Sequence, residues 1–405
     1  MSHKRLSSLA PLALGIGILV SPDNWVLLGN FMGQAGWAGL GILAAVMVFY
    51  ASFALLLCRS YRQETDLTFL KRPEIWEFAT FINRAALALF LSTGILVSAG
   101  FVFNEVFVYW FPNFGFAYLL LILIFGIHCF LPRAVPLIQV AFIGLTLAPL
   151  LLLIFTGIAF SPPDTGMQAI PLLPKSFPGI SIIFLPLILW IGFDLSWSIK
   201  GHHKTSTPGV VVIITAGFIF ILWGLTSIFN TSLDSLSASG VPHMKTARLI
   251  LGQTGRYLMG ATLIFGTLSA VNALFTGCWL AAEALCDRKV LPPWVRRPVF
   301  IPLVLALIIS MMMGFGMAGS DNIDTMIQSA LLAWLIALTA RSAFMIKPSI
   351  FSVLIHSTLL FGIISLILKS GSPALSTLCI FAILGASFIP GMVLTHRRMA
   401  KRRSP

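Results

Sequence analysis

Long apolar runs separated by short polar segments make up most of the chain. About twelve of these runs are long enough to cross a bilayer, which takes roughly 20 residues in a helix. Their centres lie near residues 20, 47, 92, 122, 147, 190, 218, 268, 308, 334, 359 and 384. The runs lack the period-two alternation of barrel strands, and backbone in lipid must satisfy its own hydrogen bonds. The pattern therefore predicts an all-α polytopic membrane protein with about 12 transmembrane helices.

Two of the predicted spans are interrupted by polar residues near mid-depth. In the first, residues 21–24 (SPDN) separate the apolar stretches 10–20 and 25–29. In the second, the sequence 190–194 (WIGFD) places Gly192 and Asp194 within an apolar run. A carboxylate in hydrocarbon is costly and marks a solvated cavity or a pathway. Broken helices at matching places in two halves of a chain indicate the binding site of a secondary transporter.

The residues at these two breaks form the candidate substrate-binding site. Pro22 lacks a backbone N–H, and the side chains of Asp23 and Asn24 compete with the backbone for hydrogen bonds. The predicted substrate-binding residues are Ser21, Asp23, Asn24, Trp190, Gly192, Phe193 and Asp194. Two alternatives remain for the first break: an ordinary kink, or a shorter first span with residues 21–24 in an external loop.

Two kinds of coupling ion fit the polar residues within the spans. Asp23 and Asp194 would carry a proton, since an intramembrane carboxylate can serve in a proton relay. Thr267 and Ser269 of the eighth span would supply oxygen ligands for sodium, or else bond to nearby carbonyl groups, which is the more common use of such hydroxyls. We therefore expect a proton in preference to sodium.

Arg84 and His128 are further ionisable residues in apolar runs. Arg84 lies near one end of the third span, so we expect its side chain to reach the membrane surface along its aliphatic stem. His128 is isolated in the sequence, and we interpret it as a histidine with an interior hydrogen-bond partner. Neither residue is therefore predicted to belong to the site.

Composition and charge agree with a membrane protein. The chain of 405 residues is 58% hydrophobic and 10% charged, with a mean hydropathy of +0.96; soluble domains lie well outside this range. Its net charge of +13 would suit nucleic acid, but a cytoplasmic N-terminus places most of the cations on the cytoplasmic side, as the positive-inside rule requires. We therefore predict a multi-pass protein of the cytoplasmic (inner) membrane with both termini cytoplasmic, the lipid bilayer as a partner and no nucleic acid.

Several classes of function are excluded by missing motifs. The chain contains no P-loop, no His-Glu-x-x-His and no Gly-x-Ser-x-Gly, which are the marks of nucleotide-driven pumps, metalloproteases and serine hydrolases. The two aspartates do not match the Tyr-Asp and Gly-x-Gly-Asp pattern of intramembrane aspartyl proteases. The five cysteines show neither paired nor metal-like spacing. We therefore expect no enzyme activity, no cofactor and no metal site.

Three segments together carry a resemblance to a known family. Residues 12–17 (LALGIG), 191–194 (IGFD) and 269–292, which begin SAVNA and end DRKVLP, follow one another in the chain. In this order they resemble the first, sixth and eighth helices of the amino acid–polyamine–organocation (APC) superfamily of permeases. Two places depart from that family: SPDN at 21–24 stands where it has a glycine-rich break, and KGHHK at 200–204 follows the sixth span.

The resemblance implies a fold and a function. It implies a single domain over 1–405 with a five-plus-five inverted repeat, broken helices 1 and 6, and two accessory helices. Approximate divisions are 9–158, 179–346, 349–396 for the accessory helices and 397–405 for a basic cytoplasmic tail. The expected function is that of a secondary active transporter (a permease, symporter or exchanger) that moves an amino acid or organic amine, its small-molecule substrate, by alternating access. The alternative is a transporter-like membrane sensor or scaffold that binds a ligand without moving it.

Overall fold

Helices make up the regular structure of the described chain. The structure, a computed structural model, describes residues 3–62, 73–160, 180–198, 207–320, 322–346 and 348–403. Within these ranges every regular element is an α-helix or a 3-10 helix. The predicted all-α class is confirmed.

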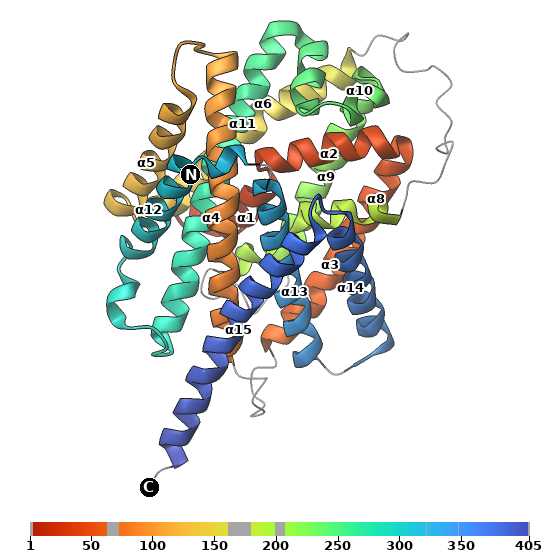
Figure 1. Cartoon of the computed structure of the whole chain (residues 1–405). Coiled ribbons are helices and arrows are strands. Elements are labelled where there is room, and N and C mark those ends of the chain that lie inside the picture. Colours follow the sequence, from red (N-terminus) through yellow and green to blue (C-terminus); the bar gives the residue numbers. More distant parts are fainter. Residues whose placement is uncertain are drawn as a thin grey trace.

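The elements follow the apolar runs of the sequence (Figure 1). They are α1 (His3–Leu19), α2 (Pro22–Ala35), α3 (Trp37–Arg62), α4 (Pro73–Val106), α5 (Asn113–Phe130), α6 (Val135–Ala159), α8 (Ile180–Phe184), η2 (Leu185–Trp190), η3 (Phe193–Trp197), α9 (Thr207–Asn230), α10 (Leu233–Ser237), α11 (Pro242–Asp287), η4 (Pro293–Arg296), α12 (Phe300–Gly314), η5 (Met317–Gly319), α13 (Ile323–Met345), α14 (Ile350–Lys369) and α15 (Pro373–Arg403).

The helices are long and apolar enough to cross a membrane several times. Among the described residues, 9 single helices meet that condition, and the bent pair Leu9–Leu19 and Pro22–Ala35 makes a tenth span. The two remaining predicted spans correspond to shorter apolar segments, Ile182–Trp197 and Phe300–Gly314. Large apolar side chains cover the outside of the bundle; Phe155, Leu368 and Phe381, for example, are each about 70% exposed. The protein is a multi-pass membrane protein.

The two broken spans lie inside the bundle, where other helices enclose them. α1 packs against α6, α11, α9 and η3, and α3 packs along α9. The long helix α4 packs against α5, α11, α13 and α15. In Figure 1, α2 runs across the direction of α4, and α15 extends beyond the other helices. Irregular backbone at membrane depth is tolerated when protein covers it, and this packing provides the cover.

Candidate functional site

The first break lies between α1 and α2, which are bent by 56° with respect to each other. Ser21 is extended (φ −62°, ψ 152°) and Pro22 opens α2. The carbonyl groups left without a helical partner at the end of α1 accept hydrogen bonds from side chains. Asn24 Nδ2 donates to Leu19 O at 2.9 Å, and Trp25 Nε1 donates to Val20 O at 3.1 Å. Ser21 and Asn24 are buried. The break therefore lies within the bundle and not in an external loop.

The second break separates two short 3-10 helices, η2 and η3. Ile191 is extended (φ −66°, ψ 129°), and Gly192 has φ +108°, a left-handed conformation that a residue with a Cβ rarely adopts. Tyr50 on α3 donates its hydroxyl to Leu187 O at 2.6 Å, and Trp190 Nε1 donates to Ile213 O at 3.2 Å. The neighbouring helices α3 and α9 thus hold η2, the segment that leads into Gly192.

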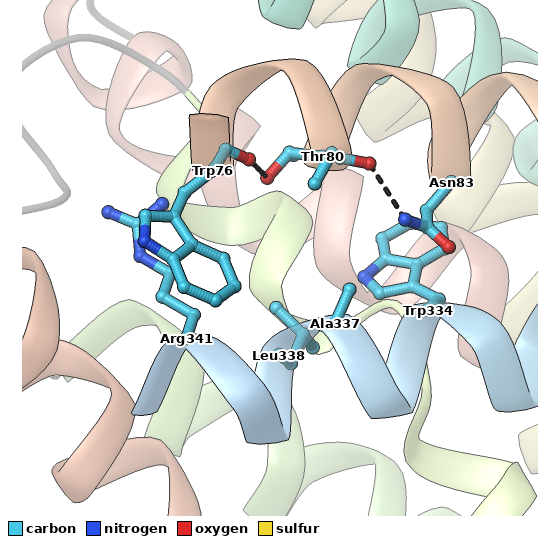
Figure 2. A pocket seen from close by; sticks show the side chains of 8 residues that line it. Trp76, Thr80, Asn83, Trp334, Ala337, Leu338 and Arg341 are labelled. Atoms are coloured by element: carbon cyan, nitrogen blue, oxygen red, sulfur yellow. Dashed lines mark hydrogen bonds between the residues drawn. The ribbon is translucent and has the colours of Figure 1, made fainter. Parts of the chain in front are cut away.

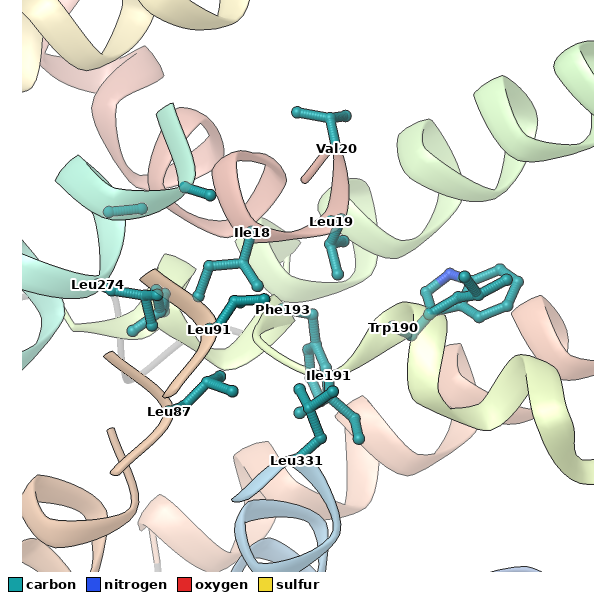
Figure 3. Packing of buried hydrophobic residues seen from close by; sticks show 14 of the residues in the cluster. Ile18, Leu19, Val20, Leu87, Leu91, Trp190, Ile191, Phe193, Leu274 and Leu331 are labelled. Atoms are coloured by element: carbon teal, nitrogen blue, oxygen red, sulfur yellow. The ribbon is translucent and has the colours of Figure 1, made fainter. Parts of the chain in front are cut away.

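The two breaks meet at one place, which we call the junction. Asn24 Nδ2 also donates to Leu189 O at 3.4 Å, so one amide group connects the first break to the second. A Cβ built on Gly192 would lie 3.1 Å from the Ile18 side chain, so the end of α1 passes directly beside the second break. Figure 3 shows Ile18 and Leu19 beside Ile191 and Phe193, with Leu87 and Leu91 of α4 on one side.

Buried aromatic rings line the junction on the side of α3 and α9. The Trp190 ring is stacked on that of Tyr50, with centroids 6.0 Å apart, and it meets Phe220 edge-on at 5.5 Å. Phe193 meets Tyr50 edge-on at 5.8 Å, and Trp25 meets Phe220 at 5.7 Å. These five rings, the aromatic cluster, are fully buried. The predicted site residues Trp190 and Phe193 therefore belong to one aromatic wall.

Asp194 forms a buried ion pair with Arg84. Arg84 Nη2 lies 3.1 Å from Asp194 Oδ2, and both side chains are at most 5% exposed. Arg84 Nη1 also donates to the carbonyl oxygen of Gly277 on α11 at 3.2 Å, and the guanidinium lies 5.8 Å from the centroid of the Trp334 ring. The expectation that Arg84 snorkels to the membrane surface is wrong, because the chain offers it a carboxylate and a carbonyl inside the bundle.

Asp23 lies at the other side of the junction, in the first turn of α2. Its side chain is partly exposed, unlike those of Ser21 and Asn24. The carboxylate of Asp324, which is exposed in the first turn of α13, is close enough for its charge to act on Asp23. Sequence reasoning missed Asp324, since no pattern in the sequence brings the start of α13 to the first break.

A small cavity lies between α4 and α13, next to the ion pair (Figure 2). Its volume is about 10 Å³, which is room for about one water molecule. Figure 2 shows Asn83 on α4 facing Trp334 on α13, with Arg341 at the other end. Asn83 is 1% exposed, and its Oδ1 has no hydrogen-bond partner. Two of the residues that line the cavity are neighbours of the ion pair: Asn83 adjoins Arg84 in the sequence, and the Trp334 ring lies 5.8 Å from the Arg84 guanidinium.

The two candidate sodium ligands use their hydroxyl groups within the bundle. Thr267 Oγ1 donates to Leu263 O at 2.9 Å, in its own helix, with Ile95 O of α4 at 3.4 Å. Ser269 Oγ accepts a hydrogen bond of 3.0 Å from Gln139 Nε2 on α6. None of these hydrogen bonds involves Asp23 or Asp194.

Comparisons with known proteins bear on the fold. No protein-family model matches the sequence, and no curated protein matches it either. Among solved structures, a manganese transporter from Eremococcus coleocola in complex with an aromatic bis-isothiourea compound is similar, with a TM-score of 0.55, 13% identity, and coverage of 98% of this chain and 97% of that chain. The fold is shared. Two mutant forms of that transporter are similar too, with TM-scores of 0.53 and 0.52 at 14% identity over 96% of this chain and 94% of theirs.

Proposed function

We propose that this protein is a secondary transporter that moves a small organic amine or amino acid by alternating access. The observation that carries the proposal is the Asn24 amide bond to Leu189 O, which joins two helix breaks inside one membrane bundle. Broken helices that meet at mid-depth form the binding sites of many secondary transporters. Membership of the amino acid–polyamine–organocation superfamily is part of the proposal.

The chemistry of the junction favours a substrate with an ammonium group. Asp194 already has Arg84 as its cation, so Asp23 is the carboxylate that would bind a substrate's positive charge or carry the coupling proton. The exposed Asp324 adds a second negative charge that acts on Asp23. The aromatic cluster would cover the apolar part of the substrate, and its rings attract an organic cation over their faces. Phe193 would help to occlude the site.

A divalent metal ion is the alternative substrate, because the similar solved structures are described as those of a manganese transporter. Manganese prefers several carboxylate, carbonyl or water oxygens. Within the described residues, no three side chains of histidine, cysteine, aspartate or glutamate gather closely enough to hold a metal ion. The aromatic cluster together with the Asp23 carboxylate fits an organic amine better.

The proposal also includes the arrangement of the chain in the membrane. Alternating access would move the half 9–158 against the half 179–346, with 349–396 as accessory helices. The protein would lie in the cytoplasmic (inner) membrane, and both of its termini would lie in the cytoplasm. Residues 200–204 lie outside the described residues, and so do the side chains of the basic tail 397–405. The two broken spans would each begin one half.

Ligand binding to the purified protein tests the substrate class. We expect organic amines or amino acids, added singly, to raise the melting temperature of the wild-type protein in detergent. The change Asp23→Asn removes the charge that would bind the ammonium group, so it should abolish the shift. Asp234→Asn, at an exposed aspartate in the first turn of α10, is the matched control and should respond like wild type. A shift caused by manganese and reversed by a chelator, with none from any amine, would overturn the proposed substrate class.

A further inference from the structure

A buried amide oxygen at the small cavity between α4 and α13 lacks a donor. Asn83 of α4 lines this cavity and is 1% exposed, and its Oδ1 has no hydrogen-bond partner among the described residues. A buried acceptor left without a donor is costly, and lipid around a membrane span supplies none. Such an atom therefore indicates a small donor that the protein holds in the cavity.

The orientation of the Asn83 amide is fixed by the two hydrogen bonds that it donates. Nδ2 donates to Ala79 O at 2.8 Å and to Ser387 Oγ of α15 at 3.1 Å. The Ser387 hydroxyl gives its own hydrogen to Ile383 O at 2.7 Å, so toward Asn83 it can only accept. Turning the amide over would direct its oxygen at two acceptors. Oδ1 is therefore the atom that remains for a partner in the cavity.

The size and the lining of the cavity restrict what can bind there. Its volume of about 10 Å³ holds one molecule of the size of water and excludes any larger organic ligand. The side chain of Arg341, a residue that is 2% exposed, lines the same cavity, so a metal or ammonium ion would meet a buried positive charge. An anion would meet the lone pairs of Asn83 Oδ1, which can only accept. A neutral molecule that both donates and accepts fits both ends.

Both helices offer such a molecule further partners. On α4, Thr80 Oγ1 gives its hydrogen to Trp76 O at 2.7 Å, which leaves the lone pairs of this hydroxyl able to accept. On α13, Trp334 and Arg341 line the cavity with side chains that carry N–H donors (Figure 2). A buried water needs about 2–4 polar partners. Asn83, Thr80 and an N–H group of α13 supply them.

We propose that one resident water occupies this cavity and donates to Asn83 Oδ1 and Thr80 Oγ1, with an N–H group of α13 as its own donor. The water joins α4 to α13 next to the ion pair, since Asn83 precedes Arg84 in the chain. Together with the bond to Ser387, it makes the Asn83 amide a connection from α4 to both α13 and α15. The site belongs to the folded protein and does not depend on the proposed transport function.

Radiolytic labelling of the purified full chain tests for this water. A short X-ray exposure splits water into hydroxyl radicals, and a buried ring is oxidised when a bound water lies against it. Trp334 is 2% exposed and lines the cavity, so we expect mass spectrometry to find it oxidised in wild type. Asn83→Leu keeps the size of the side chain but removes the acceptor, and it should lose most of this oxidation.

A second change tests the same site through stability. Ala337 lines the cavity, and Ala337→Val fills it and expels the water. Filling a dry cavity usually stabilises a protein. Here it would leave Asn83 Oδ1 without a donor, so we expect a lower melting temperature and the loss of Trp334 oxidation. The fall in melting temperature should vanish in the Asn83→Leu background, where the crowding is the same but no acceptor is left without a donor.

Ala340→Val is the matched control, because Ala340 lies on the same helix but does not line the cavity. It has the same cost of valine in a helix, should keep the oxidation of Trp334, and should change the melting temperature equally in both backgrounds. A wild-type Trp334 that stays unoxidised would overturn the proposal, as would oxidation undiminished in Asn83→Leu. An equal fall in melting temperature from Ala337→Val in both backgrounds would show crowding in place of a lost water and would also contradict the site. None of these results affects the amine-binding test of Asp23.

Discussion

Replacing Arg84 with alanine is expected to lower the free energy of unfolding by about 3–5 kcal/mol, because it leaves a buried carboxylate without its cation. The Asp194 side chain that loses its partner has no exposed surface from which to reach water. The bond to Gly277 O is lost as well, so the second break is released from both α4 and α11. Denaturation with SDS or heat in detergent, followed by circular dichroism, measures the loss.

A double change separates the charge from the packing. Removing both charges with Arg84→Met and Asp194→Leu should recover much of the stability, since apolar replacements of a buried pair are often neutral. Arg256→Ala is the matched control, because Arg256 pairs with the 75% exposed side chain of Glu105, and such pairs contribute about 0–1 kcal/mol. If Arg84→Ala costs no more than Arg256→Ala, the ion pair does not hold the second break.

Replacing Gly192 with alanine is the second change from which we expect a large effect. Its φ of +108° is a conformation that L-residues rarely adopt, and such strain costs on the order of 1–3 kcal/mol. The new methyl group would also press on Ile18 at 3.1 Å. We expect lower thermal stability together with weaker ligand binding. Relief of the strain would move the second break, whose Leu189 O accepts the hydrogen bond from Asn24.

Two other glycines serve as controls for Gly192→Ala. Gly252 also has positive φ, at +59°, but a Cβ there would meet nothing within 4 Å. Gly252→Ala therefore shows the effect of a positive φ without crowding, at a ψ of −134° in place of −8°. Gly41 lies in α3 with open space around it, and Gly41→Ala should stabilise the helix by up to about 1 kcal/mol. A Gly192→Ala variant as stable as Gly41→Ala would contradict the strained break.

The sequence was sufficient to predict the spans and the positions of both breaks. Hydrocarbon demands long apolar helices, so each span is visible as a run of residues. Pro22 and Gly192 mark the breaks because one lacks a backbone donor and the other permits positive φ. These are local signals, and they do not depend on which helix lies beside which.

Contacts between spans were not predictable in this way. Within the sequence of its own helix, Arg84 fits a side chain that reaches the membrane surface. Only the folded bundle brings its guanidinium to Asp194. Gln139 is a single polar residue in an apolar run, and the sequence does not show that its amide donates to oxygens on two other helices. Which residues of two spans meet depends on how each helix is rotated and how deep it lies in the membrane. The hydrophobicity of the sequence determines neither. An arginine and an aspartate in otherwise apolar spans are the one signal that would have suggested the ion pair.

Counterflow in proteoliposomes tests transport most directly. Vesicles that contain the purified protein are loaded with an unlabelled amine or amino acid that raises its melting temperature, and uptake of the labelled compound is followed. We predict that wild type and Asp234→Asn accumulate label transiently above equilibrium and that Asp23→Asn does not. If wild type binds the compound but shows no counterflow, the protein is not a transporter of that compound, and a membrane sensor or scaffold becomes the better description.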